Sequence, residues 1–146
     1  MMVSFALFFG CASKESSESM SIEQTIINTQ KARLVLEDNS TLLISATYLN
    51  NIKKYSANEL DTVVLIVYYS KNGDVEIKEP NITFGTKTAH VATLSTDDEI
   101  IKYLPIQNKW SRYFLASVPK TSEDYLNLSV EIYPFEKVLL RFQKDL

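Results

Sequence analysis

The stretch Thr62-Val-Val-Leu-Ile-Val-Tyr-Tyr-Ser70 decides the fold class of this chain of 146 residues. β-Branched and aromatic side chains, which favour strands, fill it almost without a break. Such a continuous apolar run indicates a strand that is covered on both faces. Lys71-Asn72-Gly73-Asp74 follows, and then the strand-like run Val75-Glu76-Ile77. Asn-Gly between two such runs predicts a hairpin with a type I′ turn, because both central residues of that turn need a positive φ.

Other runs alternate apolar and polar residues at the period of a strand. The clearest is Leu126 to Tyr133, which is followed after a turn by Lys137 to Gln143 and predicts a C-terminal hairpin. Further strands are expected at residues 31–36, 41–49, 82–84, 90–94 and 110–118. Roughly seven to nine short strands separated by turns predict an all-β fold, an antiparallel β-sandwich that is immunoglobulin-like in architecture.

One short helix is expected near residues 97–104. Thr96 and Glu99 match a capping box, in which each side chain satisfies a backbone N–H at the start of a helix. Residues 24–37 are ambiguous apart from the strand expected within them, because Ser21 and Gln24 fit a second capping box whereas the β-branched run Thr25-Ile26-Ile27 disfavours a helix. A small membrane β-barrel is the competing fold, but it needs spans of about 9–11 residues, and several of the expected strands are shorter.

Composition excludes several classes of function. The net charge is −3 and the basic residues are scattered, which gives no reason to expect nucleic acid binding. The three glycines lie too far apart for a phosphate-binding loop, so no nucleotide is expected. The only histidine, His90, cannot supply a zinc site alone, and the carboxylates at 97–99 suit the first turn of a helix. We therefore expect no enzyme, no catalytic residue, no cofactor and no metal.

Trp110 and Tyr113 are candidates for a ligand-stacking surface. Aromatic side chains at such spacing present their faces to sugars and apolar molecules. In a β-protein they are also frequent core residues or cross-strand partners. The sequence leaves both interpretations open.

Asn39 is a candidate glycosylation site. It lies in Glu37-Asp38-Asn39-Ser40-Thr41, which contains the sequon Asn-x-Thr. The segment also resembles the extended bacterial form of the sequon, because the acidic Glu37 stands two residues before the asparagine.

Cys11 is the only cysteine of the chain. It ends an apolar run over residues 1–10 and precedes a polar stretch over residues 12–21. The box Phe8-Phe9-Gly10-Cys11 resembles the signal of a bacterial lipoprotein. This resemblance implies that residues 1–10 are removed and that Cys11 becomes a lipidated N-terminus, where two or more acyl chains give stable anchoring. Residues 11–21 would then form a flexible tether to a single domain over residues 22–146.

The resemblance also implies a location in the cell envelope. The residue after the cysteine is Ala12 rather than aspartate, which implies the periplasmic face of the outer membrane. The leading hypothesis is a lipid-anchored, non-catalytic β-sandwich that binds another envelope protein or stabilises an envelope assembly. The alternative is a ligand-binding lipoprotein that captures a glycan or a small apolar molecule on an aromatic face.

Overall fold

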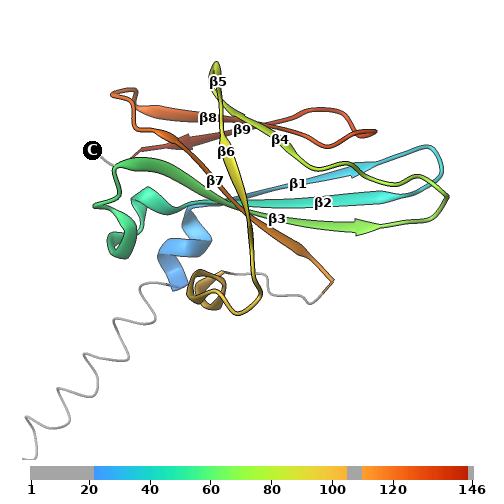
Figure 1. The fold of residues 1–146 in the computed structure, drawn as a ribbon, viewed down its shortest axis with the longest axis horizontal. Coiled ribbons are helices and arrows are strands. Elements are labelled where there is room, and N and C mark those ends of the chain that lie inside the picture. Colours follow the sequence, from blue (N-terminus) through green and yellow to red (C-terminus); the bar gives the residue numbers. More distant parts are fainter. Residues whose placement is uncertain (1–21, 105–109, 145–146) are drawn as a thin grey trace, which may run out of the picture.

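The computed structural model of the chain describes residues 22–104 and 110–144, without the side chain of residue 103. Its strands form two antiparallel sheets that pack face to face (Figure 1). The predicted all-β antiparallel sandwich is confirmed. The predicted signal, Cys11 and the tether lie outside the described residues.

The two sheets, A and B, contain nine strands between them. Sheet A has the order β1-β2-β3-β7-β6, with β1 at Thr29–Val35, β2 at Thr41–Tyr48, β3 at Leu60–Ser70, β6 at His90–Leu94 and β7 at Arg112–Pro119. Sheet B has the order β5-β4-β8-β9, with β4 at Asn81–Phe84, β5 at Lys87–Thr88, β8 at Tyr125–Glu131 and β9 at Val138–Gln143. All the expected strands but one are present, and the two-residue strand β5 is additional.

β3 is the central strand of sheet A, with β2 and β7 along its two edges. Val63, Leu65 and Val67 face the main core between the sheets. Val64 and Ile66 point to the other side of the sheet and belong to a second apolar cluster. All five are nearly inaccessible to solvent, so the prediction that this strand is covered on both faces is confirmed.

Short helical segments cover part of the outer face of sheet A (Figure 1). They are an α-helical segment at residues 22–27 and the 3₁₀ helices η1 (Leu49–Asn51), η2 (Lys53–Tyr55) and η3 (Glu99–Tyr103). Ile101 and Leu104 lie in the second apolar cluster and are each 5% exposed. The helix expected near residues 97–104 is therefore present as a 3₁₀ helix.

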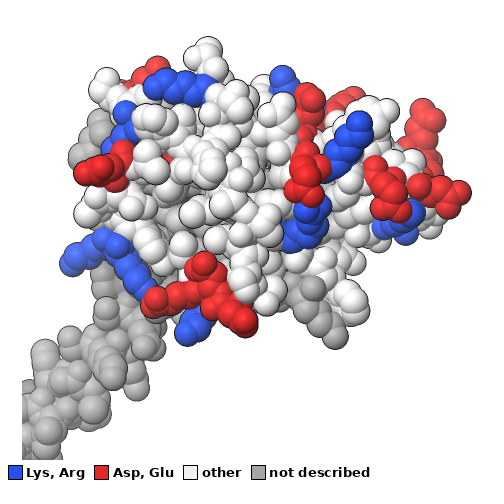
Figure 2. All heavy atoms as spheres, in the orientation of Figure 1, with Lys and Arg blue, Asp and Glu red and all other residues white. Residues whose placement is uncertain are grey.

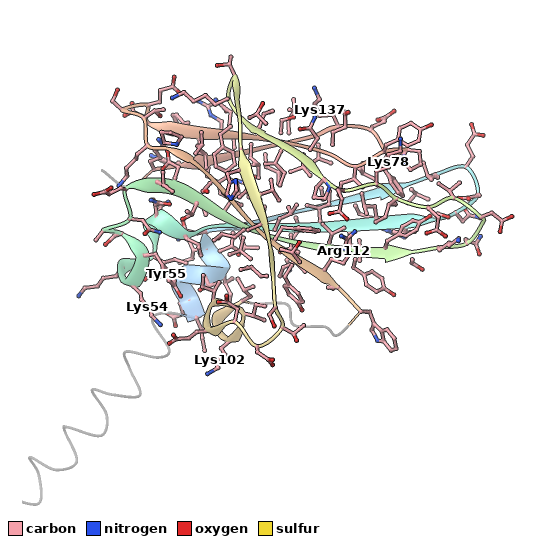
Figure 3. The ribbon with its side chains drawn as sticks, viewed as in Figure 1. Lys54, Tyr55, Lys78, Lys102, Arg112 and Lys137 are labelled. Atoms are coloured by element: carbon pink, nitrogen blue, oxygen red, sulfur yellow. The ribbon has the colours of Figure 1, made fainter. Side chains whose placement is uncertain are left out.

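The predicted capping box of η3 is wrong. Its N-cap is Asp98, whose carboxylate accepts a hydrogen bond from the N–H of Ile100 at 3.2 Å. The helix begins two residues later than Thr96 would require, which puts Glu99 in the first turn. Glu99 forms an ion pair with Lys54 of η2 at 3.0 Å, and Figure 3 shows Lys54 beside Tyr55 in this part of the molecule.

The predicted Asn-Gly hairpin after β3 is also wrong. Residues 75–77 form no strand, and neither Asn72 nor Gly73 has a positive φ. β3 already pairs with a strand along each edge, so a returning strand would find no free edge. Residues 71–80 carry the chain from sheet A to sheet B instead.

Asn72 and Gly73 pack against the turn that joins β1 to β2. The N–H of Asn72 donates to Oγ of Ser40 at 3.0 Å, and its side-chain amide donates to the carbonyl of Asp38. A Cβ on Gly73 would clash with the Asp38 carboxylate, so a larger residue here would have to displace that side chain. The left-handed residue of the region is Asn39, with φ at 69°.

The alternation predicted for the C-terminal hairpin is confirmed. Leu128, Val130 and Ile132 are at most 1% exposed, and β8 pairs with β9 in antiparallel register. Charged side chains of both signs are interspersed over the face of the molecule that Figure 2 shows. Within residues 22–104 and 110–144, no helix has the length and apolar character that crossing a bilayer requires.

Candidate ligand-binding groove

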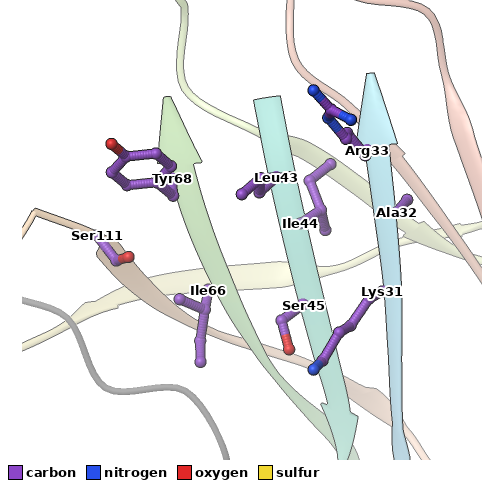
Figure 4. Close-up of a pocket in the computed structure, with 9 residues that line it drawn as sticks. All are labelled: Lys31, Ala32, Arg33, Leu43, Ile44, Ser45, Ile66, Tyr68 and Ser111. Atoms are coloured by element: carbon purple, nitrogen blue, oxygen red, sulfur yellow. The ribbon is translucent and has the colours of Figure 1, made fainter. Parts of the chain in front are cut away.

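The outer face of sheet A carries a groove of about 370 Å³ (Figure 4). It lies beside the second apolar cluster, with which it shares Ile66. Its lining includes residues of three strands and the residue before β7: Lys31 and Arg33 of β1, Leu43 and Ser45 of β2, Ile66 and Tyr68 of β3, and Ser111. We call this hollow the sheet A groove.

Strand register brings these side chains together in two rows. Arg33, Leu43 and Tyr68 stand opposite one another across β1, β2 and β3. Lys31, Ser45 and Ile66 form the neighbouring row. Because successive side chains of a strand point to opposite faces, the two residues that each strand contributes to these rows project from the same face of sheet A.

The floor of the groove is apolar and partly open to solvent. Leu43 is 41% exposed at its centre, and Tyr68 is half-buried beside it. Val35, two residues beyond Arg33 on β1, extends this apolar surface and is 53% exposed. Burying such surface under a ligand is favourable at about 25 cal/mol per Å² of apolar area.

Two hydroxyl groups at the groove lack a hydrogen-bond partner among the described residues. Ser45 is 4% exposed and Ser111 is 8% exposed, and neither Oγ has a donor or acceptor within bonding distance. Buried hydroxyls are nearly always bonded, because an unsatisfied one costs about 1–3 kcal/mol. Both Oγ atoms are closed to solvent, so they lie beneath the groove surface and do not contact a molecule that occupies it.

The positive charges at the groove are also without a counterion in the described part of the chain. Neither Lys31 nor Arg33 forms an ion pair there, and both side chains are exposed. Lys54, Lys71 and Arg112 are each paired with a glutamate, whereas other exposed cations of the described residues, such as Lys87 and Lys137, also have no ion pair. The groove thus combines an apolar floor with an uncompensated positive rim.

The structure separates the residues that the sequence singled out. Trp110 is 70% exposed and directly precedes Ser111, whereas Tyr113 is 3% exposed within the second apolar cluster. The two rings therefore do not share one accessible surface. Asn39 is exposed in the turn between β1 and β2. Cys11 lies outside the described residues.

A buried polar network joins the end of β9 to the start of β3. Lys144 forms an ion pair with Asp61 and also donates to the carbonyl and the hydroxyl of Thr121, at 3.2 and 3.1 Å. The hydroxyl of Tyr48 donates to the other carboxylate oxygen of Asp61 at 2.7 Å. Because the charged pair is closed to solvent, the network connects elements of the fold and offers no surface to a ligand.

Neither the groove nor the network was identified from the sequence. The available signal for the groove was the alternation in the expected strands at residues 31–36 and 41–49, which places every second side chain on the outer face.

Among the described residues, no group of three or more His, Cys, Asp or Glu side chains lies close enough together to hold a metal ion. No protein-family model, no curated protein and no solved structure matches this chain.

Proposed function

We propose that this chain is a non-catalytic binding protein of a bacterial cell envelope, and that the sheet A groove captures a small apolar molecule. Ligand sites are usually hollows of about 300–1,000 Å³ with apolar walls and a few polar groups that fix orientation. The groove, at about 370 Å³, has an apolar floor with cationic side chains along one edge. The exposed floor carries the proposal, because Leu43 is 41% exposed there and a captured molecule would remove that apolar surface from water.

The uncharged fluorescent probe N-phenyl-1-naphthylamine tests this function. Its emission rises when it enters an apolar site, so titration into the protein should give a saturable increase. Leu43→Glu places a charge in the groove floor and should abolish the increase. Leu60→Glu is the matched control, because Leu60 is 44% exposed at the start of β3 and does not line the groove. No saturable signal with the unaltered protein would refute capture of apolar molecules.

The lipid anchor on Cys11 and the outer-membrane location belong to the same proposal. They rest on the resemblance of Phe8-Phe9-Gly10-Cys11 to a lipoprotein signal. Mass spectrometry of the protein isolated from its host should show a chain that begins at Cys11 and carries acyl groups. A chain that retains residues 1–10 with an unmodified thiol would contradict the anchor without affecting the groove.

Binding of another envelope protein is the second candidate function. β1 is an edge strand of sheet A, and edge strands bind extended partner segments through their free backbone groups. Val35 on this strand is a large exposed apolar residue beside the groove. A photo-crosslinker at Val35 should trap one defined envelope protein in cells, and the same group at Leu139 should not. Crosslinks of equal pattern at both positions would count against this function.

The strand order supports the finer proposal that the sandwich is immunoglobulin-like. In that architecture one sheet has the order A-B-E-D and the other contains C-F-G. β2-β3-β7-β6 corresponds to the first order, and β4-β8-β9 corresponds to the second. β5 extends the second sheet beside β4, and β1 is an added strand beside the first position.

A further inference from the structure

We propose that the molecule captured by the sheet A groove is an apolar carboxylate, such as a medium- or long-chain fatty acid, whose head lies at β1. This inference rests on the proposed capture of an apolar molecule and adds the charge of its head. The chain would lie on Leu43, Ile66 and Tyr68, and the carboxylate would lie near the side chains of Lys31 and Arg33.

The position of the two cations favours an anionic head on the β1 edge of the groove. Lys31 and Arg33 stand two residues apart on β1, so both side chains project from the same face of the strand. They border the groove on the side of this edge strand, where a carboxylate stays in contact with water. Figure 4 shows the ammonium of Lys31 directed toward Ser45 and the guanidinium of Arg33 toward the other end of β1, so an anion there contacts one cation directly and is attracted by the second, without the full cost of burying a charge.

Ser45 lies below the Lys31 end of this edge. It stands directly opposite Lys31 in the strand register, and its Oγ is closed to solvent, so the cations alone would contact the carboxylate. An alcohol offers the same site one oxygen and no charge, so the site discriminates between the two.

Three probes with the same twelve-carbon chain separate the effect of charge from that of the chain. Dodecanoate, dodecanol and dodecyltrimethylammonium, each below its micelle concentration, would be used to displace N-phenyl-1-naphthylamine from the groove. Dodecanoate should bind about tenfold more tightly than the cationic probe, because one exposed ion pair and a second nearby cation contribute modestly. This preference should shrink as sodium chloride screens the charges.

Variants of the rim test whether the named residues produce this preference. Lys31→Gln combined with Arg33→Gln should make the affinities for dodecanoate and dodecanol equal while naphthylamine binding persists. Lys137→Gln is the matched control, because Lys137 lies just before β9 in the other sheet (Figure 3). Equal binding of all three chains to the unaltered protein would overturn the carboxylate inference and leave the proposed function standing. Absence of naphthylamine binding would overturn the proposed function itself.

Discussion

The ammonium nitrogen of Lys144 lies 2.9 Å from Oδ2 of Asp61, and the two side chains are 4% and 0% exposed. This ion pair connects the residue after β9 with the second residue of β3. It therefore joins sheet B to the central strand of sheet A at one end of the sandwich.

Removal of one partner of this pair should destabilise the fold strongly. Lys144→Met leaves the Asp61 carboxylate buried without its counterion, which should lower the free energy of unfolding by about 3–5 kcal/mol. Adding Asp61→Leu to the same protein should recover part of that loss, because no charge then remains buried. Urea denaturation measures each value. Lys137→Met, an exposed control, should change the stability by less than about 0.5 kcal/mol. Additive losses in the double variant would contradict the pairing.

Replacement of Ser45 and of Ser40 by alanine should change the stability of the protein in opposite directions. Ser45→Ala removes a buried hydroxyl that has no partner among the described residues, so the protein should become more stable by up to about 1 kcal/mol. Ser40→Ala removes the acceptor of the Asn72 N–H and should cost about 1 kcal/mol. Thermal or urea unfolding measures the stability of each variant relative to the unaltered protein. A loss of stability in Ser45→Ala would mean that its hydroxyl is already satisfied.

Gly73→Ala should be destabilising only while Asp38 is present. The new Cβ displaces the Asp38 carboxylate, which accepts a hydrogen bond from the N–H of Ser40 at 2.8 Å. Loss of that bond should lower the free energy of unfolding. In an Asp38→Ala background the bond is already absent, so Gly73→Ala should be close to neutral or slightly stabilising. Equal effects in both backgrounds, measured by urea denaturation, would exclude this coupling.

Asn39 can be tested separately for its role in the turn and for glycosylation. Its φ of 69° is readily adopted by glycine and is costly for alanine. Asn39→Gly should therefore retain the stability of the unmodified protein, whereas Asn39→Ala should lose about 1 kcal/mol. Both variants remove the sequon. If Asn39 carries a glycan in the native host, mass spectrometry should show its loss from both.

The stability of the fold should decrease in acid partly through Asp38. Hydrogen bonds from the backbone N–H and then the side chain of Ser40 hold the pKa of this carboxyl below its ordinary value of 3.8. The contribution is complete above that value and is lost as the pH falls through the lowered folded pKa. Melting temperatures measured from about pH 6 to about pH 2 should fall less steeply below the ordinary pKa in Asp38→Asn than in the unaltered protein. Parallel curves would rule out this contribution.

The strands were predictable from the sequence because their side chains obey a local rule. The alternation in β8 indicates one buried face, and the continuous apolar run of β3 indicates two. The turn at Asn72 was not predictable by the same means, since its outcome depends on which strand edges remain free. Those edges were occupied by β2 and β7, whose pairing with β3 spans distant parts of the chain.

The sheet A groove was predictable only in part. Alternation indicates that Lys31, Arg33 and Leu43 face outward, but it does not say that Ser111 joins them. The buried pair of Asp61 and Lys144 left no signal, because its members are 83 residues apart and each resembles an ordinary surface residue. Ionic contacts of this kind depend on the assembled sheets rather than on local pattern.

β3 contributes to both apolar clusters and also forms the floor of the groove through Ile66 and Tyr68. Because one strand serves both clusters, neither can melt alone, and the amide hydrogens of β3 should be among the last to exchange with solvent. A guest molecule therefore meets a preorganised surface. Little binding free energy is therefore spent on ordering the protein when a ligand binds.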